Sequence, residues 1–195
     1  MKKLGEITMN STESKIYEEV KSRCLSPNNS YGIGAWDHHI KLVYELAKSN
    51  AQNYGADEEV VALAALLHDI ASVTNKDFTE EHHIIGAEIA EELLAKENYP
   101  KDKIELIKKC IFNHRGSKLM DKNSPEEICI ADSDAMAHFY SVPSLLSMVY
   151  REKKLPIDEG AKFVKNKLNR SYNKLSSKGK ELVQKQYEAA KLLLK

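Results

Sequence analysis

The apolar run at residues 60–67 constrains the fold of this chain more than any other feature, because it leads directly into His68 and Asp69. A helix that is apolar on all sides has to be buried among other elements. Burying an imidazole next to a carboxylate costs several kcal/mol unless each group is paired or binds a metal. The pair therefore predicts a buried functional site, and a metal site is the interpretation that we favour.

Signals for helices dominate the sequence, whereas signals for strands are nearly absent. Asp57 is a suitable N-cap, with Glu58 and Glu59 in the following turn. The segment 124–127 combines an N-cap serine, a proline at the first helical position and a capping box. These patterns predict an all-α protein, a single-domain helical bundle of about eight helices. The expected helices cover residues 12–25, 36–54, 57–71, 80–97 and 100–114, and others follow Ser124, Pro143, Pro156 and Ser176 or Ser177.

Composition narrows the class of protein and its partners. The chain has 195 residues, which suits one domain with a sizeable core, and its 29 basic and 29 acidic residues give a net charge of zero. This balance predicts no nucleic acid polymer and no membrane surface as a partner. Three scattered cysteines, no apolar leader and no apolar run of about 18 residues predict a soluble, cytoplasmic protein.

The histidines cluster in the sequence, since all seven lie between His38 and His138. Taken singly, a histidine on an apolar helix face is more often a hydrogen-bonded core residue, and a plain helical bundle remains an alternative. Taken together, several helices of one bundle can project imidazole and carboxylate groups into a shared metal site. Such donors suit manganese, iron, cobalt, nickel or zinc. Asp132 and Asp134 point to different faces of their helix, so only one of them is expected at a shared site.

Five short segments place these residues in a recognisable order. They are residues 39–43 (His-Ile-Lys-Leu-Val), 66–71 (Leu-Leu-His-Asp-Ile-Ala), 82–87 (His-His-Ile-Ile-Gly-Ala), 111–114 (Ile-Phe-Asn-His) and 130–137 (Ile-Ala-Asp-Ser-Asp-Ala-Met-Ala). Together they resemble the signature of the HD-domain superfamily of metal-dependent phosphohydrolases. The second segment is similar to the HDIG variant, with Ala71 where glycine is usual. The resemblance covers residues 36–139 and implies an HD-domain-like fold.

The resemblance also implies a ligand set, which we carry over position by position. The four-ligand core would consist of His39, His68, Asp69 and Asp134, and the two-metal branch of the family adds His82 and His114. His82 is preferred to His83 because it precedes Gly86 by four residues, and Asp134 is preferred to Asp132 because Ala135 and Met136 follow it. We therefore expect one or two divalent transition metals, with Asp69 bridging them.

The function implied by the resemblance is hydrolysis of a phosphate ester or anhydride by a metal-activated water. Asp69 is the expected catalytic residue, because it would orient or deprotonate that water. Arg115 and Lys118 follow His114 and are the expected substrate-binding cations. The expected substrate is a small phosphorylated molecule, and a nucleotide is favoured. Two alternatives remain, which are an HD-type di-iron oxygenase and a non-catalytic signalling domain that binds a metal or a nucleotide.

The same resemblance suggests how the chain is divided. Residues 31–142 would form the HD-type metal-binding core, residues 1–30 an N-terminal helical extension, and residues 143–195 C-terminal helices that complete the bundle. The apolar end of the last helix leaves both a monomer and a homodimer open.

Overall fold

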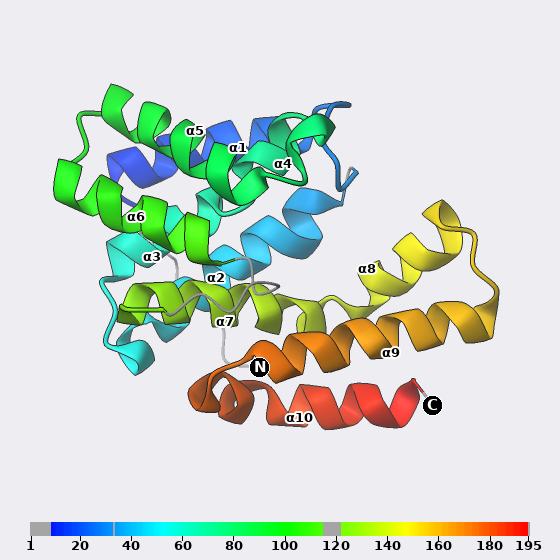
Figure 1. The fold of residues 1–195 in the computed structure, drawn as a ribbon. Helices are drawn as coiled ribbons and strands as arrows, with labels where there is room; N and C mark the ends of the chain where they lie inside the picture. Colours follow the sequence, from blue (N-terminus) through cyan, green and yellow to red (C-terminus); the bar gives the residue numbers. More distant parts are fainter. Residues whose placement is uncertain (1–8, 33, 115–121, 195) are drawn as a thin grey trace.

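The fold is known from a computed structural model that describes residues 9–32, 34–114 and 122–194. Within these ranges the chain is all-α, as the sequence predicts, and it contains ten α-helices (Figure 1). Their bounds are α1 (Ser11–Cys24), α2 (Lys41–Tyr54), α3 (Glu58–Leu67), α4 (Ile70–Thr74), α5 (His82–Lys96), α6 (Lys101–Asn113), α7 (Pro125–Tyr140), α8 (Val142–Ser147), α9 (Ile157–Lys174) and α10 (Ser177–Leu193). A 3₁₀ turn at Lys76–Phe78 and π-helical turns at Trp36–Ile40 and Met148–Glu152 complete the described elements.

The ten described helices outnumber the expected eight or so partly because one predicted helix is divided in two. The segment 57–71 forms α3 and α4 rather than one helix, and the break falls at His68 and Asp69. Asp69 has φ −111° and ψ 18°, outside the α-helical region. Successive side chains of a continuous α-helix point about 100° apart. The break therefore allows the two neighbouring side chains to turn toward one place.

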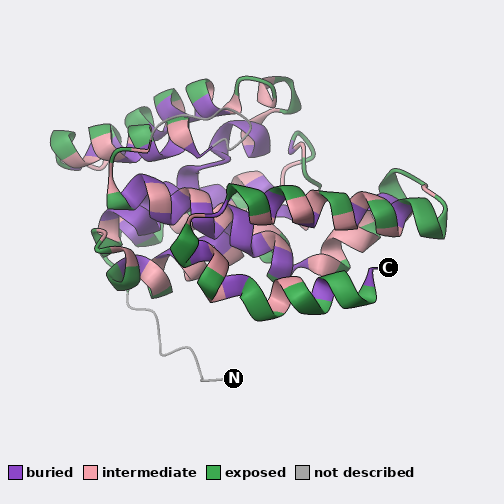
Figure 2. Cartoon of the chain, turned by 60° about the horizontal axis from the view of Figure 1, so that its bottom comes forward, coloured by how far each residue is buried: buried purple, intermediate pink, exposed green. Residues whose placement is uncertain are grey.

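Helix α3 lies at the centre of the larger hydrophobic cluster. Every residue from Val60 to Leu67 is buried, and α3 contacts α1, α2, α6 and α7. Figure 2 shows the buried residues gathered in the interior of the molecule and the exposed ones on its outer faces. An N-cap starts the helix, since the Asp57 carboxylate accepts hydrogen bonds from the backbone N–H groups of Glu59 and Val60. The complete burial that the apolar run predicts is thus achieved by helices on several sides.

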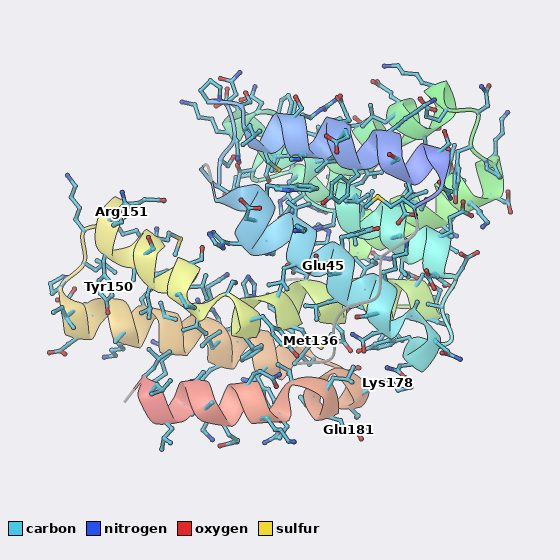
Figure 3. All side chains as sticks on the ribbon, turned by 180° about the vertical axis from the view of Figure 1, so that it is seen from behind. Glu45, Met136, Tyr150, Arg151, Lys178 and Glu181 are labelled. Atoms are coloured by element: carbon cyan, nitrogen blue, oxygen red, sulfur yellow. The ribbon has the colours of Figure 1, made fainter. Side chains whose placement is uncertain are left out.

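A second hydrophobic cluster lies on the other side of α7. It joins Ala135, Met136 and Phe139 to residues of α9 and α10, which lie next to each other along α7 (Figure 1). Met136 of α7 lies toward these C-terminal helices (Figure 3). Helix α7 also contributes Cys129 and Ile130 to the larger cluster. It therefore connects the two parts of the core, while the proposed division at residue 142 stays a prediction.

No helix in the described ranges is long and apolar enough to cross a membrane.

Candidate metal centre

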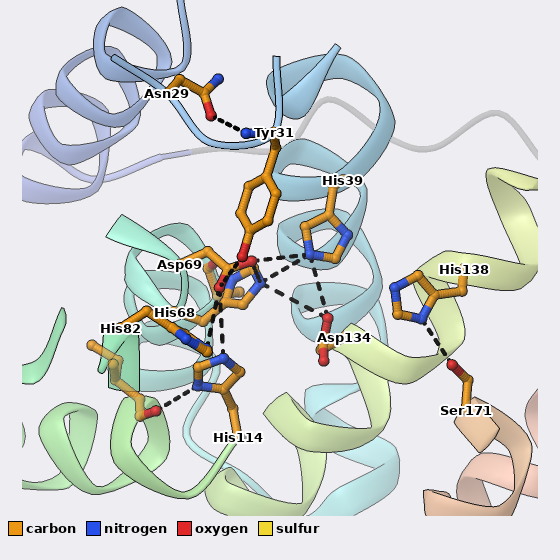
Figure 4. A network of polar contacts seen from close by, with 12 residues as sticks. Asn29, Tyr31, His39, His68, Asp69, His82, His114, Asp134, His138 and Ser171 are labelled. Carbon is orange, nitrogen blue, oxygen red and sulfur yellow. Dashed lines mark hydrogen bonds and ion pairs between the residues drawn. The ribbon is translucent and has the colours of Figure 1, made fainter. Parts of the chain in front are cut away.

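The six residues expected as ligands lie together at the junction of several elements (Figure 4). His39 comes from the π-helical turn before α2, and His68 and Asp69 come from the break between α3 and α4. The others are His82 at the start of α5, His114 at the end of α6 and Asp134 within α7. Helix ends and local irregularities thus supply five of the six side chains.

The first group of donors consists of His39, His68 and Asp134. The Nε2 atoms of the two imidazoles are 3.2 Å apart. Nε2 of His39 lies 3.4 Å from Oδ1 of Asp134, and Nε2 of His68 lies 4.0 Å from the same oxygen. These three side chains could hold one metal ion.

The second group of donors consists of Asp69, His82 and His114. Oδ1 of Asp69 lies 3.8 Å from Nε2 of His82 and 3.7 Å from Nε2 of His114. The His82 and His114 rings meet edge to face, with centroids 5.2 Å apart. This group could hold a second metal ion.

Asp69 faces both groups, with a different oxygen toward each. Its Oδ2 lies 3.3 Å from Nε2 of His39 and 3.3 Å from Nε2 of His68, whereas its Oδ1 faces His82 and His114. The residue is 5% exposed. A buried carboxylate in this position is suited to bridging two cations.

The backbone orients three of the four histidine rings for metal binding. Nδ1 of His68 lies 2.7 Å from the carbonyl oxygen of Ala65, and Nδ1 of His82 lies 2.7 Å from that of Thr79. His114 makes the equivalent contact with the carbonyl of Ile111, also three residues earlier. Because a carbonyl oxygen only accepts, each Nδ1 carries the proton and each Nε2 presents a lone pair. A hydrogen bond of this kind is the usual support of a metal-ligating histidine.

Two of the three separations in the first group also match those around a metal, whereas the third, from Nε2 of His68 to Oδ1 of Asp134, is longer at 4.0 Å. Two ligand atoms about 2.1 Å from one ion lie roughly 3.0–3.4 Å apart at octahedral or tetrahedral angles. The observed separation of 3.2 Å between the two Nε2 atoms and of 3.4 Å between His39 and Asp134 falls in this range. The residues present therefore fit a divalent transition metal in donor chemistry, and His39 also fits it in its spacing to His68 and Asp134.

The electrostatics of the cluster follow from burial and from charge pairing. Burial raises the pKa of Asp69, but the neighbouring imidazoles, led by His68, outweigh it and hold the pKa well below its ordinary value of 3.8. Burial likewise opposes ionisation of Asp134, yet His39 and His138 help lower its pKa to about 2. Both carboxylates are therefore ionised at neutral pH and available to cations.

His83 and Asp132, which the sequence analysis weighed against His82 and Asp134 as ligands, make other contacts. His83 is buried, and its ring centroid lies 5.4 Å from that of Phe112. Asp132 accepts hydrogen bonds from the Tyr54 hydroxyl at 2.8 Å and from the backbone N–H of Ser176 at 3.0 Å. The structure thus brings His82 and Asp134 to the cluster, and their role as ligands stays a prediction. Arg115 and Lys118 lie outside the described residues.

Tyr31 lies at the centre although the sequence analysis did not single it out. Its hydroxyl donates a hydrogen bond to Oδ1 of Asp69 at 3.3 Å (Figure 4). Its backbone N–H donates to Oδ1 of Asn29 at 2.8 Å, and Asn29 in turn donates to the carbonyl of Cys24 at 2.7 Å. The loop that contains Tyr31, residues 26–34, is rich in turn-forming residues, which predict no contact with the site. The one signal in the sequence that could have pointed to Tyr31 is an aromatic residue shortly before His39.

In a comparison with protein-family models, residues 36–138 match the HD domain. The chain belongs to the HD-domain family. The resemblance noted in the sequence is thereby confirmed, and HD domains as a family bind divalent metals and generally act as hydrolases.

Among curated proteins, HD-domain relatives named ribonuclease Y match this chain. That of Petrotoga mobilis is 29% identical over 113 residues, which are 58% of this chain and 20% of the ribonuclease. That of a Sulfurovum species is 29% identical over 130 residues, which are 67% of this chain and 23% of the ribonuclease. The alignment thus spans only about a fifth of the length of these relatives.

Solved structures share the fold over nearly the whole chain. Bacillus subtilis YpgQ has a TM-score of 0.66 and 20% sequence identity, with 91% of this chain and 90% of YpgQ covered. YpgQ has also been solved in complex with ADP, with a TM-score of 0.64, 19% identity and 90% of each chain covered. A Lactobacillus plantarum protein has a TM-score of 0.63 and 17% identity, with 95% of this chain and 94% of that chain covered.

Proposed function

We propose that this HD-domain protein is a two-metal phosphohydrolase that cleaves a phosphate ester or anhydride of a nucleotide. The observation that carries the proposal is the placement of Asp69, whose two oxygens face two separate groups of donors. His39, His68 and Asp134 would hold one metal, His82 and His114 the other, and Asp69 would bridge them. Manganese, iron, cobalt, nickel and zinc suit this donor set.

Metals bound here would lower the pKa of a water molecule and polarise a phosphoryl oxygen. Asp69 would orient that water. A carboxylate with a strongly lowered pKa is a weak base, which favours orientation over proton abstraction as its main role. Tyr31 supports this role, because its hydroxyl holds the same Asp69 oxygen that faces His82 and His114.

Two comparisons support a nucleotide as the substrate. YpgQ, which shares the fold, was solved in complex with ADP, and the ribonuclease Y relatives are named for action on RNA. Both ligands contain phosphate attached to a nucleoside. The net charge of zero favours a small nucleotide over a polymer.

The test combines metal analysis with a substrate panel on the full chain. The protein is reconstituted with each of the five metals, its metal content is measured, and phosphate and pyrophosphate release are assayed with nucleoside mono-, di- and triphosphates. We expect two metals per chain and turnover of at least one nucleotide. The matched variants are Asp134→Asn, which should lose metal and activity, and Asp37→Asn, which alters an acidic residue of the same π-helical turn as His39 and should lose neither.

Three outcomes would contradict the proposal. If the protein takes up none of the five metals, the clustered histidines have a structural role rather than a metal-binding one. Oxygen consumption by the iron-loaded protein without phosphate release would favour the oxygenase. Tight nucleotide binding without turnover under any metal would favour a signalling domain.

A further inference from the structure

Lys167 lies on the face of α9 that packs against the rest of the molecule. The buried residues near it in α9 are Val164, Leu168 and Ser171. Lys167 follows Val164 by three residues and precedes Ser171 by four. Residues at these spacings share one face of a helix. Lys167 is accordingly half-buried, whereas Lys162 earlier in α9 is exposed.

This face of α9 meets the candidate metal centre. Oγ of Ser171 lies 3.0 Å from Nδ1 of His138 (Figure 4). The rings of His138 and His39 are stacked, with centroids 5.7 Å apart and an interplanar angle of 12°. Lys167 itself is close enough to interact electrostatically with Asp134, Asp69 and His39. The face of α9 that carries Lys167 is thus turned toward the first group of donors.

Within the described part of the chain, the positive charge of Lys167 has no direct partner. Among residues 9–32, 34–114 and 122–194, no hydrogen bond or ion pair is formed by its ammonium group. Burial lowers the pKa of Lys167, and the neighbouring cations Lys174 and Arg170 act in the same direction, although Asp134 and Asp69 partly oppose them. A partly buried ammonium without a partner costs free energy, which an anionic ligand would offset.

We infer that Lys167 binds a phosphate group of the substrate, and that the C-terminal helices thereby complete the catalytic site of the HD domain. The inference rests on the proposed function, since it assumes that phosphate is brought to the metals. It assigns this role to a residue outside the segment 36–138 that defines the family match. Arg170 and Lys174 are exposed on the following turns of α9 and extend the positive charge outward.

The test compares Lys167→Met with Lys162→Met in the full chain loaded with metal. Methionine keeps a long unbranched side chain but removes the charge. Two quantities are measured, the KM of the best nucleotide from the panel and the affinity for inorganic pyrophosphate by titration calorimetry. A charge-assisted hydrogen bond to phosphate predicts that Lys167→Met raises KM and weakens pyrophosphate binding about tenfold or more. Lys162→Met should match the wild type in both quantities.

Further measurements separate this role from a structural one. Metal content and the melting temperature of Lys167→Met should equal those of the wild type, and Lys167→Arg should restore most of the affinity. If Lys167→Met destabilises the fold, Lys167→Gln replaces it in the same comparison.

Unchanged KM and pyrophosphate affinity in the folded variant would overturn the inference, while wild-type metal content and turnover would leave the proposed function intact. Conversely, suppose that the wild type binds pyrophosphate and that Lys167→Met weakens this binding, yet no nucleotide is turned over. That result would refute the proposed function but not the phosphate-binding role of Lys167. A wild type that binds no pyrophosphate would overturn the inference as well.

Discussion

At the scale of the residue, Asp69 concentrates the chemistry of the site, because one carboxylate serves two groups of donors. Asn has the same shape as Asp but only one oxygen and no charge. We expect Asp69→Asn to reduce metal content from two ions per chain to one or none and to lower phosphate release by at least about 100-fold. Elemental analysis and the nucleotide assay measure both effects, and circular dichroism checks the fold. Wild-type turnover in this variant would contradict the bridging role.

The adjacent histidines offer a second test with a matched control. Nε2 of His82 faces Asp69 at 3.8 Å, whereas the ring of His83 packs beside Phe112. His82→Ala should therefore lose one metal per chain, while His83→Ala should retain both metals and lose stability instead, by about 1–3 kcal/mol as for other buried truncations. Metal content and denaturant unfolding separate the two results. Loss of metal in His83→Ala alone would reverse the assignment.

The protonation of His39 and His68 predicts how metal binding depends on pH. Burial lowers the pKa of each imidazole, but Asp69 and Asp134 outweigh burial and raise both above the ordinary value of 6.5. In the metal-free protein both rings thus take up protons as the pH falls toward 6, and a metal must displace them. Manganese affinity measured by calorimetry should rise between pH 6 and pH 8, by up to about tenfold per pH unit for each displaced proton. An affinity that is constant over this range would show that neither ring binds the ion.

At the scale of the element, irregular backbone positions the ligands. The π-helical turn carries His39, and the break between α3 and α4 carries His68 and Asp69. π-Helical turns are often found at functional sites, since they displace a side chain from the regular helical position. Uninterrupted helices in these two places would direct the side chains differently.

The packing of α10 against α7 can be tested by substituting Gly179, a glycine in the first turn of α10. A Cβ at Gly179 would lie 2.5 Å from Oδ2 of Asp132, the oxygen that accepts the Tyr54 hydroxyl. Alanine stabilises a helix by up to about 1 kcal/mol relative to glycine. A loss of stability on substitution by alanine would therefore indicate a steric clash that outweighs this gain. We expect Gly179→Ala to lower the free energy of unfolding by about 1–3 kcal/mol because of the clash.

Gly86 in α5 is the control for this substitution. A Cβ there would meet its nearest neighbour, Cγ2 of Ile111, at 3.4 Å, which is an ordinary contact. Gly86→Ala should therefore change the free energy of unfolding by less than about 1 kcal/mol. Urea unfolding of both variants gives the comparison, and equal stability of Gly179→Ala and the wild type would show that α10 can shift away from Asp132.

At the scale of the whole molecule, bound metal should stabilise the fold, because five elements converge on the centre. Ligand at 100 times its Kd adds about 2.7 kcal/mol to the free energy of unfolding. For a chain of this size, that corresponds to roughly 5–10 °C in Tm. Treatment with a chelator should lower the Tm by this amount, and added manganese should restore it. An unchanged Tm after verified metal removal would show that the ions contribute nothing to folding.

The sequence by itself determined the all-α class, the burial of α3 and the six residues that meet at the centre. The helical class and the burial of α3 follow from local signals, namely apolar periodicity and N-caps, whereas the six residues were implied by the resemblance of five short motifs to the HD-domain signature. The same signals could not divide the helix at His68 and Asp69, since nothing in residues 57–71 interrupts the helical pattern.

Only the tertiary structure decided which further side chains lie at the centre or are turned toward it. Tyr31 sits in a turn-rich loop, and Lys167 is one of many lysines in the C-terminal helices, so neither has a distinctive local pattern. Their positions depend on how the loop and α9 pack against α7 and the broken helix α3–α4. Packing between elements distant in the sequence is set by the summed burial of many side chains, which no single segment encodes.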